Sequence, residues 1–451
     1  CLFAGQYFSR YYDAAEGFDW IEVADGTFQF QLDAFKPHCD CNSYQWLTLR
    51  HVIDYSYTRP DLKYFENDNI RKNADYAIMT MNNLGYQVAY GDIGGWGPMG
   101  GEMPILRAAE WHYRDGRAQW ALNKKHAAGA RAAFSDFAVN TAQENEPVDL
   151  IGTKLWPLDE LWYNSFGGKD VVTLDKAVDK ISFRNGFNPD DQYLLLDGLS
   201  VGGHGHMDGN SVLQWTENGR VWLCDADYIK SLPKYHNGVL ILRDGQSAKI
   251  PGYCELENIA DLPSAGFSRT VTRNYAGVDW HRNLIWLKDR LFVCVDQMHA
   301  QEPSSYSFRA VWQSIGDVSM DGAKMAVEQK GQHAAITMSQ DMHCLLNNDP
   351  ETGKNWGSYR FANEPIVRVY QGILDADLQA GAQANLFTAL HASGETPSEV
   401  KLTRLSDTVA YVEGAGSPIM LAVADAAGTV TIPGALRAKA ALLLMTPEKL
   451  Y

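Results

Sequence analysis

The stretch SVGGHGHMDGNSVLQW, residues 200–215, places two histidines two positions apart in a glycine-rich setting, with an aspartate two positions further on. The segments CDADY (224–228) and KYHNGVLIL (234–242) follow it. Because alternate residues of an extended strand point to one face, we expect His204, His206 and Asp208 to share a side. Strands and turns would bring Asp225 and His236 to the same place. This concentration of ligand-type residues favours a metal site or an active site over isolated structural histidines.

Neutral imidazole and carboxylate groups are common zinc ligands, so two metal-dependent interpretations compete. The pattern H-x-H-x-D occurs in dinuclear hydrolases of the metallo-β-lactamase type, which place a histidine directly after the aspartate. Gly209 occupies that position in this chain. The dinuclear interpretation is therefore disfavoured.

Composition excludes several other classes of protein. The 451-residue chain has a formal net charge of -16, which opposes binding to nucleic acid or to an anionic membrane. No apolar run reaches the length of a membrane span. The chain shows no βαβ rhythm and no G-x-x-x-x-G-K-[ST], so a dinucleotide or P-loop site has no support. An aromatic content of 12% is compatible with stacking against sugar rings, although most aromatic residues fill cores.

The hydrophobic pattern changes from helical to strand-like along the chain. Residues 70–84, the segment after Pro104, residues 118–134 and a segment capped by Asn42 or Ser43 have helical spacing or helix-start signals. From about residue 170 the segments are strand-like, and ILRDGQ and LKDRLF look like hairpin turns; the strand-like segments include VVTLD, QYLLLDGL, RVWLCDADY, GVLILRDG and TVAYVEG. This order predicts an α+β chain with separate domains.

The segments GGHGHMDGNSVLQW, GRVWLCDADY and YHNGVLI together resemble the heparinase II/III-like region of polysaccharide lyases, of the alginate and glycosaminoglycan lyase type. The downstream VDWHRNLIWLKDRLFVCVDQM (278–298) is similar to the next hairpin of that family. The resemblance implies an incomplete N-terminal α/α toroid over residues 1–168. It implies a central antiparallel β-sandwich over 169–375 and a small C-terminal β domain over 376–451.

The resemblance also implies a zinc ion that is mainly structural, and it places His204 toward the substrate instead. The zinc ligands would be His206, Asp225 and His236. Asp227 is the alternative carboxylate ligand, and Asp208 would contact the ligands without binding the zinc itself.

These lyases cleave beside a uronic acid by β-elimination, with a tyrosine and a histidine sharing the proton transfers. Tyr44, in CDCNSYQWLTLRHVIDYS (39–56), resembles the family's tyrosine near a helix start. The family's carboxylate-neutralising residue would fall at or before residue 1, so Asn42, Gln45 and Arg50 are the local substitutes. A second alignment takes Asn42 as the neutralising residue and places the tyrosine position near Trp96, where it supplies no tyrosine.

The segment GYQVAYGDIGGWGPMGGE (85–102) resembles the family's loop over the cleft, which makes Asp92 and Trp96 expected substrate contacts. Tyr228, beside the ligand segment, is expected to line the same cleft. We therefore expect a bacterial lyase, secreted or periplasmic, that acts on an anionic polysaccharide such as alginate or a glycosaminoglycan. A uronate C5-epimerase on the same site and a non-catalytic carbohydrate-binding protein are the alternatives.

Overall fold

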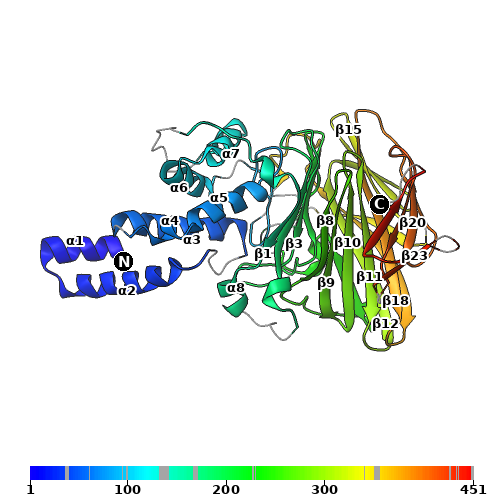
Figure 1. Ribbon diagram of the computed structural model, residues 1–451, viewed down its shortest axis with the longest axis horizontal. Helices are drawn as coiled ribbons and strands as arrows, with labels where there is room; N and C mark the ends of the chain where they lie inside the picture. The colour runs from blue at the N-terminus through cyan, green and yellow to red at the C-terminus, as the bar shows by residue number, and fades with distance from the viewer. Residues whose placement is uncertain are drawn as a thin grey trace. The chain divides into compact units, whose positions relative to one another are not determined.

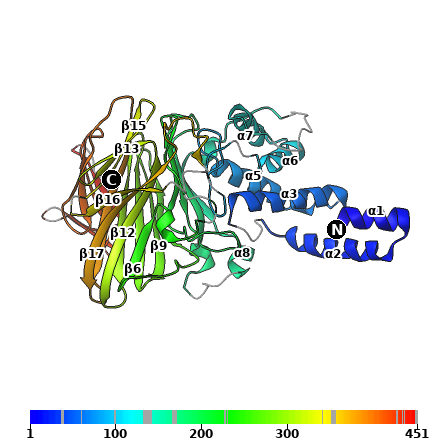
Figure 2. The same cartoon turned by 180° about the vertical axis from the view of Figure 1, so that it is seen from behind.

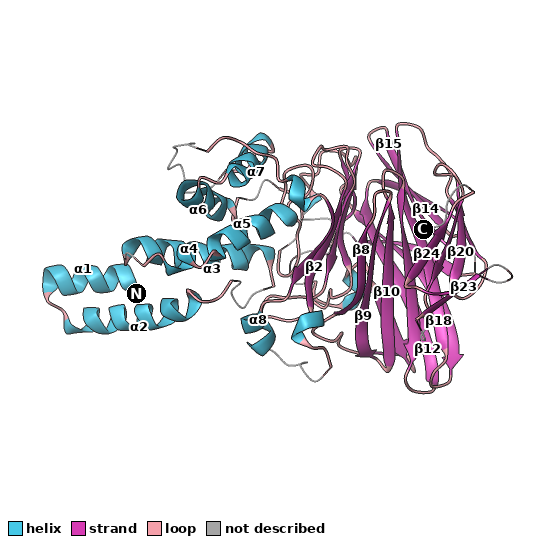
Figure 3. Ribbon diagram, viewed as in Figure 1, coloured by secondary structure: helices cyan, strands magenta, loops and turns pink. Residues whose placement is uncertain are grey.

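The computed structural model describes the chain except residues 36–39, 60, 94, 98–99, 132–141, 166–170, 226–227, 229, 340, 350–355, 426–427, 433, 435 and 448–451. The chain divides into two compact units, which are named here for their content. The helical unit contains residues 1–39, 43–78 and 99–146, and the β unit contains 40–42, 79–98 and 147–451. Helices dominate the first part of the chain and strands the second, which confirms the α+β prediction (Figure 3).

The helical unit is built from short helices whose ends follow local sequence signals. Pro104 stands in the first turn of α6, and the Asp115 side chain accepts the backbone N–H of Arg117 at the start of α7. The helices from the first part of the chain are α1 (Leu2–Tyr12), α2 (Ala15–Gln31), α3 (Asn42–Thr58), α4 (Lys63–Glu66), α5 (Asn69–Met79), α6 (Met103–Tyr113) and α7 (Gly116–Ala127) (Figure 1). The toroid that was expected for this region stays a prediction.

Two predicted helices end earlier than their hydrophobic spacing indicated. The helix expected over 70–84 stops at Met79, because the side chain of Asn82 accepts the backbone N–H groups of Leu84 and Tyr86 and forms a turn. The helix expected over 118–134 ends at Ala127.

Three antiparallel sheets of the β unit share one hydrophobic core. The large sheet has eight strands, in the order β13 (Asp317–Asp321), β14 (Lys324–Gln329), β15 (Gln332–Met338), β18 (Gln383–Gly394), β11 (Leu291–Ala300), β10 (Val278–Leu287), β9 (Ala265–Tyr275) and β8 (Glu255–Asp261). One five-stranded sheet contains β1 (Gly152–Pro157), β2 (Val178–Arg184), β3 (Tyr193–Asp197), β4 (Val212–Glu217) and β5 (Arg220–Leu223). The other contains β16 (His343–Asp349), β17 (Val367–Leu378), β12 (Ser304–Ile315), β6 (Val239–Arg243) and β7 (Gln246–Ser247) (Figure 2).

A smaller C-terminal sheet packs on the large sheet through a second apolar cluster. Its strands are β19 (Lys401–Arg404), β20 (Val409–Glu413), β21 (Ile419–Val423) and β24 (Leu442–Met445), and β22 (Thr429–Ile432) pairs with β23 (Leu436–Lys439). The expected boundary between residues 375 and 376 falls within β17, and β18 still belongs to the large sheet. The other expected boundary, at residue 168, lies outside the described residues.

The two predicted hairpins are confirmed. Asp244 and Gly245 both have positive φ between β6 and β7, as a tight two-residue turn requires. The turn at 288–290 joins β10 to β11 in full register. The expected strand VVTLD is wrong, because its end forms the short 3₁₀ helix η2 (Leu174–Lys176) and no strand includes the rest. The remaining short elements of the β unit are η1 (Val148–Leu150), α8 (Glu160–Ser165) and η3 (Pro233–Tyr235).

Candidate active site and metal centre

Two buried histidines and a buried aspartate meet inside the β unit. His206 and Asp208 come from the loop between β3 and β4, and His236 follows η3 just before β6. One ligand atom from each of the three lies within 4.8 Å of the others. Two imidazole nitrogens and a carboxylate oxygen form a donor set that suits zinc.

Unpaired polar atoms support a cation at this position. His236 Nδ1 lies 2.8 Å from Asp225 Oδ1, so an Nδ1–H donated to Asp225 leaves a lone pair on Nε2. Among the described residues, neither His236 Nε2 nor either carboxylate oxygen of Asp208 has a hydrogen-bond partner. Buried polar atoms are normally paired, and a carboxylate behind a histidine is the usual arrangement around a metal ligand. The residues therefore fit a bound zinc ion.

The carboxylate of this group differs from the one that the sequence resemblance implied. Asp225 contacts Nδ1 of His236, whereas Asp208 belongs to the group of mutually close ligand atoms. Both aspartates are buried, and both stay candidate ligands together with His206 and His236. Asp227, the other expected candidate, lies outside the described residues.

A buried cluster of acids surrounds one lysine next to this group. Lys180 Nζ, on β2, lies 2.9 Å from Asp197 Oδ1 and 3.1 Å from both Asp40 Oδ1 and Asp179 Oδ1. Burial lowers the pKa of Lys180, but Asp197 and the other two carboxylates outweigh it and hold that pKa well above its ordinary value. Burial, and then the charge of Asp197, raises the pKa of Asp208 well above its ordinary value. A divalent cation would offset the surplus of buried acid.

Arg282 holds the two ligand-bearing segments against β10. Its fully buried guanidinium donates from Nη1 to the carbonyl oxygens of Asn210 and Asn237, at 2.8 and 2.9 Å. Its Nε donates to Asp296 at 2.8 Å, which compensates the buried charge. Asn210 lies two residues after Asp208, and Asn237 directly follows His236. One arginine therefore fixes the backbone on both sides of the candidate metal site.

His204 lies beside the candidate metal group (His206, Asp208 and His236) and remains accessible, with 41% of its side chain exposed. Its Nδ1 is 2.9 Å from Asp92 Oδ2, while Asp92 Oδ1 is 3.0 Å from Nε2 of His206. The backbone N–H of Asp92 donates to the carbonyl of His204, and Gly91 with φ 67° permits this close approach. Donation of Nδ1–H to Asp92 leaves Nε2 of His204 as a proton acceptor, an arrangement typical of a general base.

The electrostatic surroundings of His206 favour a metal ligand. Burial, and then the nearby His236, lowers the pKa of His206 below its ordinary value. A neutral imidazole is the form that binds a metal ion.

The expected strand through His204, His206 and Asp208 is wrong. Residues 198–211 form an irregular loop apart from an isolated bridge at Leu199, so strand alternation does not align these side chains. Hydrogen bonds from distant segments orient them instead. His204 and His206 share Asp92, and the backbone N–H of Met207 donates to the carbonyl of Ser231.

The residues expected from 42–50 divide between the two units. Tyr44, half-buried, lies in the first turn of α3, Gln45 beside it is fully buried, and Arg50 pairs with Asp54 at 3.9 Å; all of them belong to the helical unit. Asn42 belongs to the β unit, where its side-chain amide donates to the carbonyl of Val88. Their proposed roles in proton transfer and carboxylate binding stay predictions.

Two expected substrate contacts have different surroundings. The ring of Trp96 lies 3.9 Å from the ring of Tyr86 and 5.1 Å from that of Tyr359, between centroids, so it takes part in an aromatic cluster. Tyr228 is 50% exposed. Asp92, also expected to contact substrate, holds the two histidines. Sequence reasoning missed Lys180 and Arg282, although each is a charged residue inside an otherwise strand-like segment.

Solved structures match the fold of this chain, whereas comparison of sequences assigns it to no family. No family model and no curated protein matches the sequence. Heparan sulfate lyase HepC from Pedobacter heparinus, in a mutant form, aligns with a TM-score of 0.64 at 12% identity over 94% of this chain. A heparinase III structure aligns with a TM-score of 0.65 at 11% identity over 90% of this chain. The chain has a heparinase III-like fold. It spans 64% of the length of the first of these proteins and 63% of the second.

Proposed function

We propose that this chain is a polysaccharide lyase that cleaves a uronic-acid-containing polysaccharide, of the glycosaminoglycan or alginate kind, by β-elimination. One observation carries the proposal most directly. An accessible histidine, His204, is held through Nδ1 by Asp92 next to the buried candidate metal group of two histidines and an aspartate. The heparinase III-like fold supports the same class of reaction, because one matched structure is named a heparan sulfate lyase and the other heparinase III.

In β-elimination, the proton at C5 of the uronate leaves, a C4–C5 double bond forms and the C4–O bond breaks. The departing oxygen then takes a proton. Asp92 keeps the imidazole of His204 in one orientation and tautomer, so that Nε2 accepts or returns a proton at the sugar. We assign the second proton transfer to Tyr44, and the neutralisation of the uronate carboxylate to Asn42, Gln45 or Arg50.

The candidate metal group would support the arrangement of His204 and Asp92 from the buried side of the site. His206, His236 and Asp208 would hold zinc, with Asp225 orienting His236, or with Asp225 itself as the carboxylate ligand. Zinc, when bound, supplies a fixed positive charge that links the β3–β4 loop to the segment before β6. Because His204 is two residues from His206 and shares Asp92 with it, a rigid metal group also limits the movement of His204.

The test is ultraviolet absorbance of the unsaturated uronate formed by purified protein on a panel of uronic-acid polysaccharides. The panel contains alginate, glycosaminoglycans, ulvan and glucuronan. We expect a rise on at least one polymer, loss of the rise in His204→Ala, and an unchanged rate in His343→Ala, an exposed histidine on β16. Silence on every polymer by zinc-loaded protein would refute the lyase. Deuterium incorporation at C5 without a double bond would identify the C5-epimerase instead, and binding without either signal the carbohydrate-binding alternative.

A secreted or periplasmic location in a bacterium is part of the same proposal, since large uronic-acid polymers are met outside the cytoplasm. Among the described residues, no helix is long and apolar enough to span a membrane.

A further inference from the structure

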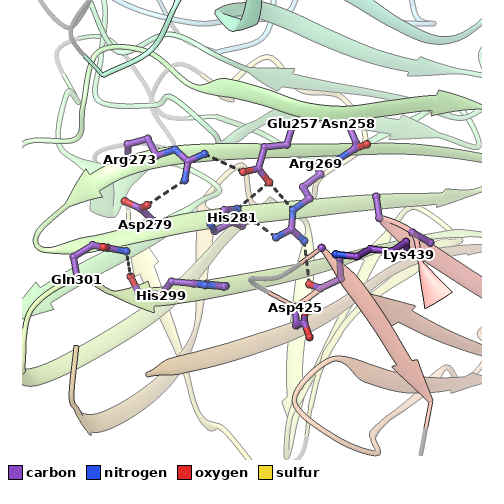
Figure 4. A pocket seen from close by; sticks show the side chains of 14 residues that line it. Glu257, Asn258, Arg269, Arg273, Asp279, His281, His299, Gln301, Asp425 and Lys439 are labelled. Carbon is purple, nitrogen blue, oxygen red and sulfur yellow. Dashed lines mark hydrogen bonds and ion pairs between the residues drawn. The ribbon is translucent and has the colours of Figure 1, made fainter. Parts of the chain in front are cut away.

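A polar cavity of about 630 Å³ opens on the large sheet and shares no residue with the candidate active site (Figure 4). Strands β8 to β11 supply its floor, and residues around β22 and β23 supply its rim. The cavity lies entirely within the β unit.

The floor of this cavity is the polar half of a sheet face whose other half is apolar. Along β10, Ile285 and Leu287 pack under the C-terminal sheet, whereas His281, two strand repeats earlier on the same face, lines the cavity. Along β11, Val293 lies in the apolar half and His299 in the polar half. Packing of the C-terminal sheet explains the apolar half only. In the polar half, Arg269 and Gln297 donate to the carbonyl of Ala424 at the rim, whereas Arg273, Asp279, His281 and His299 line the cavity, and this favours a binding role.

Ion pairs hold the floor in one arrangement. Glu257 accepts from Arg269 Nε at 2.7 Å and from Arg273 Nη2 at 3.0 Å, and it lies 3.1 Å from His281 Nδ1. Arg273 also donates to Asp279 at 3.1 Å (Figure 4). The side chains come from three neighbouring strands, so the network is positioned before any ligand enters.

His299 is the exception in this paired network. It is 8% exposed and lines the cavity, and its Nε2 has no hydrogen-bond partner among the described residues. Its ring lies 4.7 Å from that of His281, between centroids. Burial, and then the charges of His281 and Arg269, lowers the pKa of His299 to about 4, so the ring is neutral near pH 7. A buried, neutral and unpaired ring nitrogen in a cavity is suited to a ligand hydroxyl.

The charges around the cavity balance, and this balance favours an uncharged ligand over an anion. Three cationic side chains and three carboxylates line it; these are Arg269, Arg273, Lys439, Glu257, Asp279 and Asp425. An anion would meet as many carboxylates as cations, and the chain as a whole carries a net charge of -16. A hydroxyl both donates and accepts hydrogen bonds, so it matches a surface where donors and acceptors alternate.

We propose that this cavity is a second carbohydrate site, which binds an uncharged sugar residue with one hydroxyl on His299 Nε2. The proposal is independent of the lyase activity, because it concerns binding at a different face of the β unit and needs no metal.

The experiment is titration of the full chain with neutral sugars, followed by calorimetry and by saturation-transfer NMR. The probes are glucose, galactose, N-acetylglucosamine and cellobiose, with glucuronate and sulfate as anionic comparisons. We expect at least one neutral sugar to bind. His299→Leu, which keeps the volume but removes the nitrogen, should weaken that binding roughly five- to tenfold, as expected for one lost hydrogen bond.

Two further variants make the result decisive. Lys439→Ala changes an exposed side chain at the rim and should also weaken binding, so the test survives if His299→Leu fails to fold. His204→Ala should leave the affinity unchanged. The proposal is overturned if no neutral sugar binds or if only the anions bind. Loss of sugar binding in His204→Ala, with retention in His299→Leu and Lys439→Ala, would place the sugar in the candidate active site and equally overturn it.

Discussion

Substitution of Asp208 by asparagine should have opposite effects on stability with and without zinc. Asparagine has nearly the same shape but carries no charge. In metal-free protein the carboxylate oxygens of Asp208 have no partners among the described residues, and its neighbours include Asp197 and Asp225. Asparagine leaves polar atoms in place but removes the buried charge and its repulsion from Asp197 and Asp225, and each unit of raised pKa corresponds to about 1.4 kcal/mol. We therefore expect Asp208→Asn to raise the free energy of unfolding of the metal-free protein by about 1–2 kcal/mol.

Zinc should reverse this order. A ligand at a hundred times its dissociation constant stabilises the folded state by about 2.7 kcal/mol. The wild type should gain this amount, while Asp208→Asn, which lacks one of the proposed ligands, should gain little. Urea unfolding in chelator and in excess zinc gives the four free energies, and elemental analysis of dialysed protein gives the zinc content.

Asp225→Asn is the matched control, because an amide oxygen still accepts the Nδ1–H of His236. We expect this variant to retain zinc with about 10–100-fold weaker affinity, as for partners behind metal ligands. If Asp225→Asn loses zinc and Asp208→Asn keeps it, Asp225 is the ligand, as the sequence resemblance implied. Retention of zinc-dependent stabilisation by both variants would refute the argument from unpaired atoms.

Three further predictions concern the chemistry and the buried charges. His204→Ala should lower lyase turnover at least about 10²-fold while keeping zinc and the unfolding midpoint, and zinc loss equal to that of His206→Ala would contradict the separation of their roles. Lys180→Met should reduce the free energy of unfolding, measured in urea, by about 3–5 kcal/mol, because three buried carboxylates lose their cation. Lys176→Met, at an exposed ion pair, should leave it nearly unchanged, and equal losses in the two variants would refute the argument. Burial raises the pKa of Glu217 to about 8, so the folded protein favours its neutral form. The contribution of that form to the free energy of unfolding is complete below about pH 4 and is lost as the pH rises through 8. Glu217→Gln should flatten this fall in urea unfolding, and parallel profiles for variant and wild type would count against it.

The sequence by itself determined the class of each element where the local signal was strong. The Asp244–Gly245 dipeptide specified a hairpin because few other residue pairs tolerate two positive φ angles in succession. The two short apolar runs LIWL and LFVCV, separated by KDR, likewise specified β10 and β11, since a continuous apolar run of strand length can be buried on both faces of a strand. The density of histidine and aspartate between 204 and 236 also marked the region of the candidate site, because such residues are rarely buried together without a purpose.

Only the tertiary structure decided which of these residues meet. The side chains of an irregular loop have no fixed period, so their directions depend on partners that lie far away in sequence. Asp92 reaches His204 across 112 positions, and Asp40 reaches Lys180 across 140. The choice between Asp208 and Asp225 beside His236 depends on hydrogen bonds made by Arg282 and Asn237, which no local pattern encodes. Local propensity therefore set the strands and turns, and the packing of distant strands set the chemistry between them.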